Sequence, residues 1–272
     1  MSTQEITSMD KSQVLSTHHE KSQYNLSQIL GIWALASISG ALLFWLGLPV
    51  LDRITEISVG YLVPIVTVIP YVWHFLLAFL ILKREGSDLD WNTIKDRLWL
   101  RTTANPRTGK RNNALWLWVI PVIAVYGLTA AAPIFQSIND GWAHILPIHE
   151  PAQYSFDVLF ENPGALVGDW GFFLTILVVS VLTMSEEIIF RGILLPKMNG
   201  VFGRVDWVAN GLLFALYHLD KPWTWPSFIM YSTLTLALPA RLFRSTWFST
   251  AVHLSQGLFF LYLTLGLVLG LA

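Results

Sequence analysis

Residues 178–195 read VVSVLTMSEEIIFRGILL, an apolar run that carries three charged side chains, Glu186, Glu187 and Arg191. The run belongs to a longer apolar segment, residues 171–195, which is long enough to cross a bilayer core of about 30 Å as a helix. An ionisable group inside such a helix costs about 2.5–3.5 kcal/mol on insertion scales and is therefore a candidate for function. The stretch predicts a membrane-spanning helix that holds a polar site.

The composition of the whole chain supports a membrane protein. Of 272 residues, 54% are hydrophobic and 13% are charged, whereas soluble domains average roughly 25% charged residues. The 17 basic and 18 acidic residues give no basic surplus, which argues against a nucleic-acid partner. The absence of cysteine excludes disulfides, thiolate metal sites and a cysteine nucleophile.

Apolar segments long enough or nearly long enough to span a bilayer recur along the chain. We predict an all-α, polytopic transmembrane helix bundle with about seven spans, at 29–51, 57–82, 114–135, 171–195, 205–219, 226–243 and 247–271. The expected organisation is a polar cytoplasmic tail at 1–28, three spans within 29–135 that enclose a basic loop at 83–113, an extracytoplasmic loop at 136–170, and a helix bundle at 165–272 that holds the polar site.

Loop charges predict the orientation of the bundle. The loop at 83–113 carries eight basic residues, whereas the loop at 136–170 carries no lysine or arginine and has five acids, Asp140, Glu150, Asp157, Glu161 and Asp169. Because basic residues concentrate in cytoplasmic loops, the first loop is expected to be cytoplasmic and the second extracytoplasmic. This assignment predicts a cytoplasmic N-terminus.

Helix geometry predicts different surroundings for the two adjacent acids. Glu187 and Arg191 are four residues apart, so they can pair on one face of the helix and share the cost of burial. Glu186 points about 100° away from Glu187 and has no such partner in its own helix, which makes it a candidate general base. The alternative is that both acids lie near the interface and reach water, which short glutamate side chains do poorly.

Two histidines in other predicted spans, His218 and His253, can join this helix in a common site because a bundle core brings side chains of different helices together. A single intramembrane histidine is as often a hydrogen-bonded core residue, and we expect such a packing role for His74. The expected depths of Glu186, His218 and His253 span roughly 10–20 Å, so their convergence requires tilt or shifted helix ends.

The segments Glu186-Glu187-Ile-Ile-Phe-Arg191 and Phe214-Ala-Leu-Tyr-His218, followed by His253, resemble in order and setting the three motifs of the CAAX-protease and bacteriocin-processing family. This family of intramembrane endopeptidases includes abortive-infection-type proteins, and its eukaryotic members remove the last three residues of prenylated proteins. The resemblance covers about residues 165 to 260.

The resemblance implies a role for each matching residue. Glu186 and His218 would activate a water for attack on the scissile carbonyl, His253 would stabilise the oxyanion, and Glu187 and Arg191 would support them. Members are often called metalloproteases, and Glu186, His218 and His253 could bind zinc with an open position for water. The same side chains could instead act without a metal, as general base and oxyanion donors. Both alternatives remain open at the sequence level.

The chain departs from the family pattern at Gly257. The family usually has asparagine, sometimes aspartate or serine, four residues after the third-motif histidine, and glycine has no side chain to donate a hydrogen bond. Gln256 or a water is expected to substitute. Losing one oxyanion donor typically costs about 10²–10³ in rate, so a catalytically silent member is the alternative.

These observations predict a multi-pass protein of a prokaryotic plasma membrane that cleaves a membrane-associated peptide or lipidated-protein substrate, in a cavity open to the cytoplasm. One alternative is a silent relative that acts as a membrane-embedded binding or immunity factor. A proton-coupled carrier is a third hypothesis, but carriers usually show internal repeats and the chain shows none.

Overall fold

The computed structural model describes residues 23–57, 59–86, 89–131, 133–152, 155 and 158–271. These residues form helices and connecting loops, and within these ranges the only β pairing is an isolated bridge between Ala104 and Arg111. The predicted all-α fold is therefore confirmed. Most of the predicted polar tail (residues 1–22) and Asp157 lie outside the described residues.

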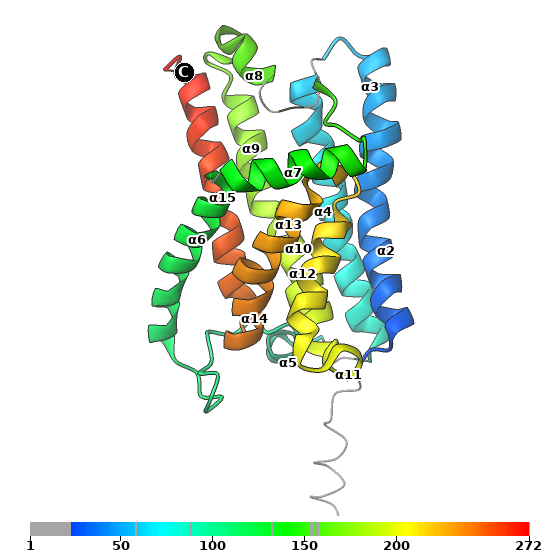
Figure 1. Ribbon diagram of the computed structural model, residues 1–272, viewed down its shortest axis with the longest axis vertical. Coiled ribbons are helices and arrows are strands. Elements are labelled where there is room, and N and C mark those ends of the chain that lie inside the picture. The colour runs from blue at the N-terminus through cyan, green and yellow to red at the C-terminus, as the bar shows by residue number, and fades with distance from the viewer. Residues whose placement is uncertain are drawn as a thin grey trace, which may run out of the picture.

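Four long helices run side by side along the long axis of the molecule (Figure 1). The first is the continuous helix Leu26–Ile54, which comprises α2 (Leu26–Leu42), the π-helix η1 (Leu43–Gly47) and α3 (Leu48–Ile54), and the second is α4 (Val59–Arg84). The third, Trp170–Lys197, comprises α9 (Trp170–Leu182), α10 (Met184–Glu187), the π-helix η5 (Ile188–Leu194) and the 3₁₀ turn η6 (Leu195–Lys197), and the fourth is α15 (Thr246–Val268). Each is long and apolar enough to cross a membrane.

Three shorter helical segments complete the bundle. They are η2 (Asn113–Trp118) with α6 (Val119–Ala131), α12 (Asp206–Tyr217), and the run α13 (Trp225–Tyr231), η9 (Ser232–Ala237) and α14 (Leu238–Phe243). Each of the seven predicted apolar segments thus contains a helix. The number of complete spans and the cytoplasmic N-terminus stay predictions.

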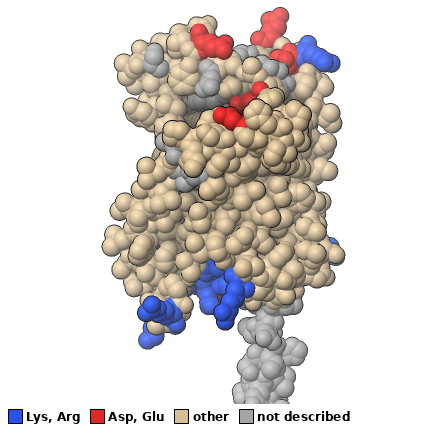
Figure 2. Space-filling view, in the orientation of Figure 1, with Lys and Arg blue, Asp and Glu red and all other residues tan. Residues whose placement is uncertain are grey.

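The segments predicted as loops also contain short helices. The basic loop holds α5 (Trp91–Arg97), and the chain between the fourth and fifth predicted spans holds α11 (Asn199–Phe202) and η7 (Gly203–Val205). The acidic segment 136–170 includes most of α7 (Pro133–Ile145), which crosses the bundle (Figure 1), followed by α8 (Val158–Glu161) and η4 (Pro163–Leu166). On the face in Figure 2, the acidic side chains lie toward the upper end and most of the basic ones at the lower end, and a basic group also lies beside the acids at the upper right.

The main apolar core surrounds the third long helix. Ile189, Phe190, Phe214, Phe248 and Val252 are completely buried in it. They come from η5, α12 and α15, so the core fixes the relative positions of the three segments that carry the predicted site residues. Helices suit this setting because they satisfy backbone polar groups within the segment, which a bilayer core requires.

A buried ionic network holds the basic loop against η5. Arg97 at the end of α5 is 5% exposed and forms two hydrogen bonds with Glu85, through Nε at 2.7 Å and Nη2 at 2.8 Å. The same guanidinium donates to the main-chain oxygens of Gly192 at 3.0 Å and Ile193 at 3.2 Å. Tyr24 and Lys197 contact Glu85 as well. The loop that was predicted only to set orientation therefore also anchors the helix that carries Glu186.

This network predicts a pH-dependent stability. Burial alone would raise the pKa of Glu85. The opposing effect of Arg97 and Lys197 is larger, and the pKa is lowered to about 2. Because the folded pKa lies below the unfolded value of about 4.3, the ionised carboxylate stabilises the protein above that value, and this contribution is lost as the pH falls toward 2. We expect the thermal unfolding temperature of the detergent-solubilised protein to fall as the pH is lowered through this range. The fall should be smaller for Glu85→Gln.

At pH 7 the Glu85→Gln variant should be destabilised by about 1–3 kcal/mol, because buried donors of Arg97 lose their acceptors. The exposed Glu56 provides the matched control, and Glu56→Gln should unfold as the wild type does. Identical pH profiles for Glu85→Gln and the wild type would contradict the network.

Candidate active site

Glu186 lies near the end of α10, directly before the π-helix η5. The preceding residue, Ser185, places its Oγ 3.4 Å from Nδ1 of His74, and Nε2 of that histidine lies 3.2 Å from the main-chain oxygen of Ala36. His74 is completely buried between the helices. The predicted hydrogen-bonding role of His74 is confirmed, and it fixes the turn that precedes Glu186.

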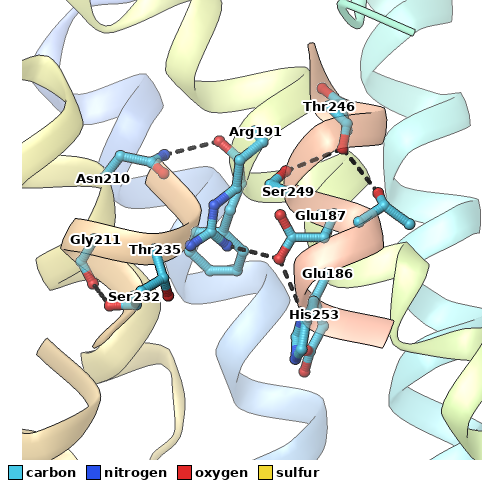
Figure 3. A network of polar contacts seen from close by, with 12 residues as sticks. Glu186, Glu187, Arg191, Asn210, Gly211, Ser232, Thr235, Thr246, Ser249 and His253 are labelled. Carbon is cyan, nitrogen blue, oxygen red and sulfur yellow. Dashed lines mark hydrogen bonds and ion pairs between the residues drawn. The ribbon is translucent and has the colours of Figure 1, made fainter. Parts of the chain in front are cut away.

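Glu187 forms the predicted pair with Arg191. The Nη1 group of Arg191 donates to Oε1 of Glu187 at 3.1 Å, and both side chains are completely buried. The guanidinium also lies 4.2 Å from the ring centroid of Phe214, a cation–π contact. The same Oε1 atom lies 3.0 Å from Nδ1 of His253, which comes from α15 (Figure 3). One carboxylate therefore joins two helices.

His253 lies between the two adjacent acids. Its Nδ1 contacts Glu187, and its Nε2 lies 3.7 Å from Oε2 of Glu186. Glu186 is 2% exposed, so the alternative that these acids reach water at the interface is wrong for this structure. The contact to Glu187 orients the imidazole ring, which leaves Nε2 directed toward Glu186.

His218 follows directly after α12 and begins the loop that leads to α13. Its ring packs edge-on against Phe214 and Phe228, with centroid distances of 5.2 and 4.9 Å, and its Nδ1 lies 3.6 Å from Oδ1 of Asp220. The main-chain oxygen of His218 accepts a hydrogen bond from the indole of Trp225 at 2.9 Å. These contacts hold the histidine where the helix stops.

One cavity brings the three predicted catalytic residues together. A hollow of about 130 Å³ is lined by Glu186, His218 and His253, and by Gln256 and Gly257. A larger cavity of about 320 Å³ also contacts Glu186 and His218, and its lining includes Glu150, Lys221 and Trp223. The predicted convergence of residues from three helices is thus found in the structure.

The side chains do not form a metal site as they stand. Among the residues that the structure describes, no group of three or more histidine, aspartate or glutamate side chains has an arrangement that could hold a metal ion. The 3.7 Å between Nε2 of His253 and Oε2 of Glu186 is a separation that two ligands of one zinc ion could have, since each lies about 2 Å from the metal. The described side chains of Glu186, His218 and His253 nevertheless do not form a ready zinc ligand set.

Sequence reasoning did not single out several cavity residues. Tyr71 from α4 lines both hollows, Tyr217 lines the larger one, and Ser180 from α9 lines the smaller one. Tyr217 stood inside the second motif as an apparent spacer. Ser180 and Tyr71 lie in apolar runs, where the sequence gives no signal that distinguishes a cavity-lining hydroxyl from a packed one.

The buried triad predicts a large stability effect. Arg191→Met removes the buried guanidinium that pairs with Glu187 while roughly preserving volume, so the folded protein should lose about 3–5 kcal/mol of stability. The exposed pair of Arg101 and Asp96 provides the control, since Arg101→Met should cost at most about 1 kcal/mol. Thermal unfolding in detergent measures both, and equal stabilities of the two variants would contradict this assignment.

Comparison with known proteins gives one family match. Residues 168–259 match the family model described as type II CAAX prenyl endopeptidase Rce1-like. The matched segment includes Glu186, His218 and His253. No curated protein and no solved structure gives a significant match.

Proposed function

We propose, from the match of residues 168–259 to the type II CAAX prenyl endopeptidase family model, that this chain hydrolyses a peptide bond of a membrane-associated substrate inside the bundle. The observation that carries this proposal is the single cavity lined by Glu186, His218 and His253. A carboxylate and two imidazoles around one hollow are the groups that water activation and oxyanion stabilisation require.

The proposed reaction uses the side chains of the chain itself. In this reaction Glu186 and His218 position a water between them. Glu186 accepts a proton from the water as the water oxygen attacks the scissile carbonyl carbon. His253 lies between two carboxylates, and in the proposed reaction its Nε2–H donates a hydrogen bond to the developing oxyanion. Glu186 then returns the proton to the leaving amine as the C–N bond breaks, giving a carboxylic acid and an amine.

The lining of the two hollows bears on the side from which substrate arrives. Besides Glu186, the charged residues that line them are Glu150, Asp220 and Lys221, and none of the lining residues comes from the basic loop 83–113. The loop charges predict that the basic loop is cytoplasmic and that Glu150 is extracytoplasmic. We therefore propose that substrate enters from the extracytoplasmic side, rather than from the cytoplasm.

The cavity walls indicate the chemistry of the substrate segment. Leu43, Phe44 and Val66 line the larger hollow together with Glu186, and Lys221 contributes a basic side chain to the same lining. Apolar walls with a few polar groups are typical of sites that bind a mainly apolar ligand in a fixed orientation. An apolar or lipidated peptide with a polar end fits this arrangement.

The central test is Glu186→Ala. We expect the purified wild type in liposomes to cleave members of an apolar peptide library, and Glu186→Ala to lower kcat by at least about 10³-fold because the general base is lost. Glu161→Gln, which changes an exposed acid of α8, should keep wild-type activity. Mass spectrometry of the products measures each outcome.

Two results would redirect the proposal. Folded wild type and Glu186→Ala that both fail to cleave would favour the silent binding relative, which the glycine at position 257 supports. Wild-type activity that a chelator abolishes and zinc restores would contradict the metal-free reaction written above.

The absence of cysteine from the chain makes the orientation directly testable. We expect Glu161→Cys to react with a membrane-impermeant maleimide in intact cells, and Lys110→Cys to react only after permeabilisation, because the basic loop should be cytoplasmic. Both positions are exposed. The opposite labelling pattern would indicate that substrate enters from the cytoplasm.

A further inference from the structure

Gly257 faces Ser180 across the contact between α15 and α9. A Cβ atom at position 257 would lie 2.7 Å from Cβ and 2.9 Å from Oγ of Ser180. Such separations are shorter than van der Waals contact, so one of the two groups would have to move. The missing side chain at position 257 is therefore what allows Ser180 to occupy this space.

The Ser180 side chain lies in the proposed catalytic cavity. It lines the hollow of about 130 Å³ together with Glu186 and His253. On α15, Gly257 follows His253 by four residues, so both lie on the same face of that helix, one turn apart. Because Ser180 packs onto Gly257, its hydroxyl is presented one turn away from the imidazole that faces Glu186.

The hydroxyl of Ser180 donates only a long, weak hydrogen bond. Its Oγ donates to the main-chain oxygen of Gly257 at 3.4 Å, near the limit for a hydrogen bond. Thr183, one turn later and also lining the hollow, donates to the main-chain oxygen of Ser180 at 2.7 Å. Of these two hydroxyls of α9, that of Ser180 can more easily turn toward a bound substrate.

We propose that Ser180 is a catalytic residue that donates a hydrogen bond to the oxyanion beside His253, in the space that a side chain at position 257 would otherwise fill. This inference rests on the proposed peptidase function. The hydroxyl stays protonated throughout, so the step adds a hydrogen bond to the transition state and changes no covalent bond. A serine hydroxyl, rather than Gln256, is then the second oxyanion donor.

Close helix packing is the competing explanation, since small residues allow membrane helices to approach each other. Ser180→Ala separates the two explanations because alanine keeps the close approach and removes only the hydroxyl. We expect Ser180→Ala to lower kcat by about 10²-fold with KM changed by less than about twofold, as for loss of an oxyanion donor. Thr175→Val, the matched control, removes a hydroxyl of α9 that lines neither hollow and should keep wild-type kcat.

A kcat of Ser180→Ala within about threefold of the wild-type value would overturn the inference. A wild type that cleaves no substrate would instead overturn the proposed function, so the two failures are distinguishable.

An exchange of side chains tests the spatial argument. Gly257→Asn alone should abolish activity, because its Cβ collides with Ser180. In the double variant Ser180→Gly/Gly257→Asn the colliding atoms are removed, and the asparagine amide can donate from the same space. We expect the double variant to exceed Ser180→Gly in kcat by about 10-fold. Equal kcat values for two folded variants would overturn the proposal that this space holds an oxyanion donor.

Discussion

The bundle depends on one buried carboxylate, Glu187, which contacts Arg191 of its own helix and His253 of α15. An unpaired charge in an apolar core is strongly destabilising, so the two helices must meet where both partners reach the same oxygen. Phe214 covers the guanidinium from α12. The buried charge of Glu187 thereby fixes the positions of three helices. Glu186, which directly precedes it, is turned toward the cavity as a consequence.

The π-helix η5 makes this arrangement compatible with a continuous helix. A π segment weakens the regular i to i−4 ladder and occurs often at functional sites. Here the main-chain oxygens of Phe190, Gly192 and Ile193 accept hydrogen bonds from side chains outside the helix. Asn210 of α12 supplies one donor and Arg97 of the basic loop supplies the others. The distortion that follows Glu187 is thus stabilised from two directions.

The sequence predicted local relations better than distant ones. The pairing of Glu187 with Arg191 followed from helical spacing alone, and it is found. The sequence alone did not establish that His218 meets Glu186 and His253, because the depths expected for these three residues in the membrane disagreed. The structure removes that disagreement by ending α12 at Tyr217, so that His218 belongs to a loop inside the bundle. Arg97 could not be predicted as a core residue, since nothing in a basic loop distinguishes a buried arginine from a solvated one.

The geometry also constrains the conformation of a substrate. An α-helix has a diameter of about 10–12 Å with its side chains, and its carbonyl oxygens are engaged in internal hydrogen bonds. An oxyanion donor can act only on a carbonyl that is free to accept, so the reaction proposed for the hollow beside Glu186 and His253 calls for a peptide that is extended there. Chain ends and segments flanking a membrane helix meet this condition without unfolding a helix inside the bilayer, so the proposed reaction favours them over the middle of a transmembrane helix.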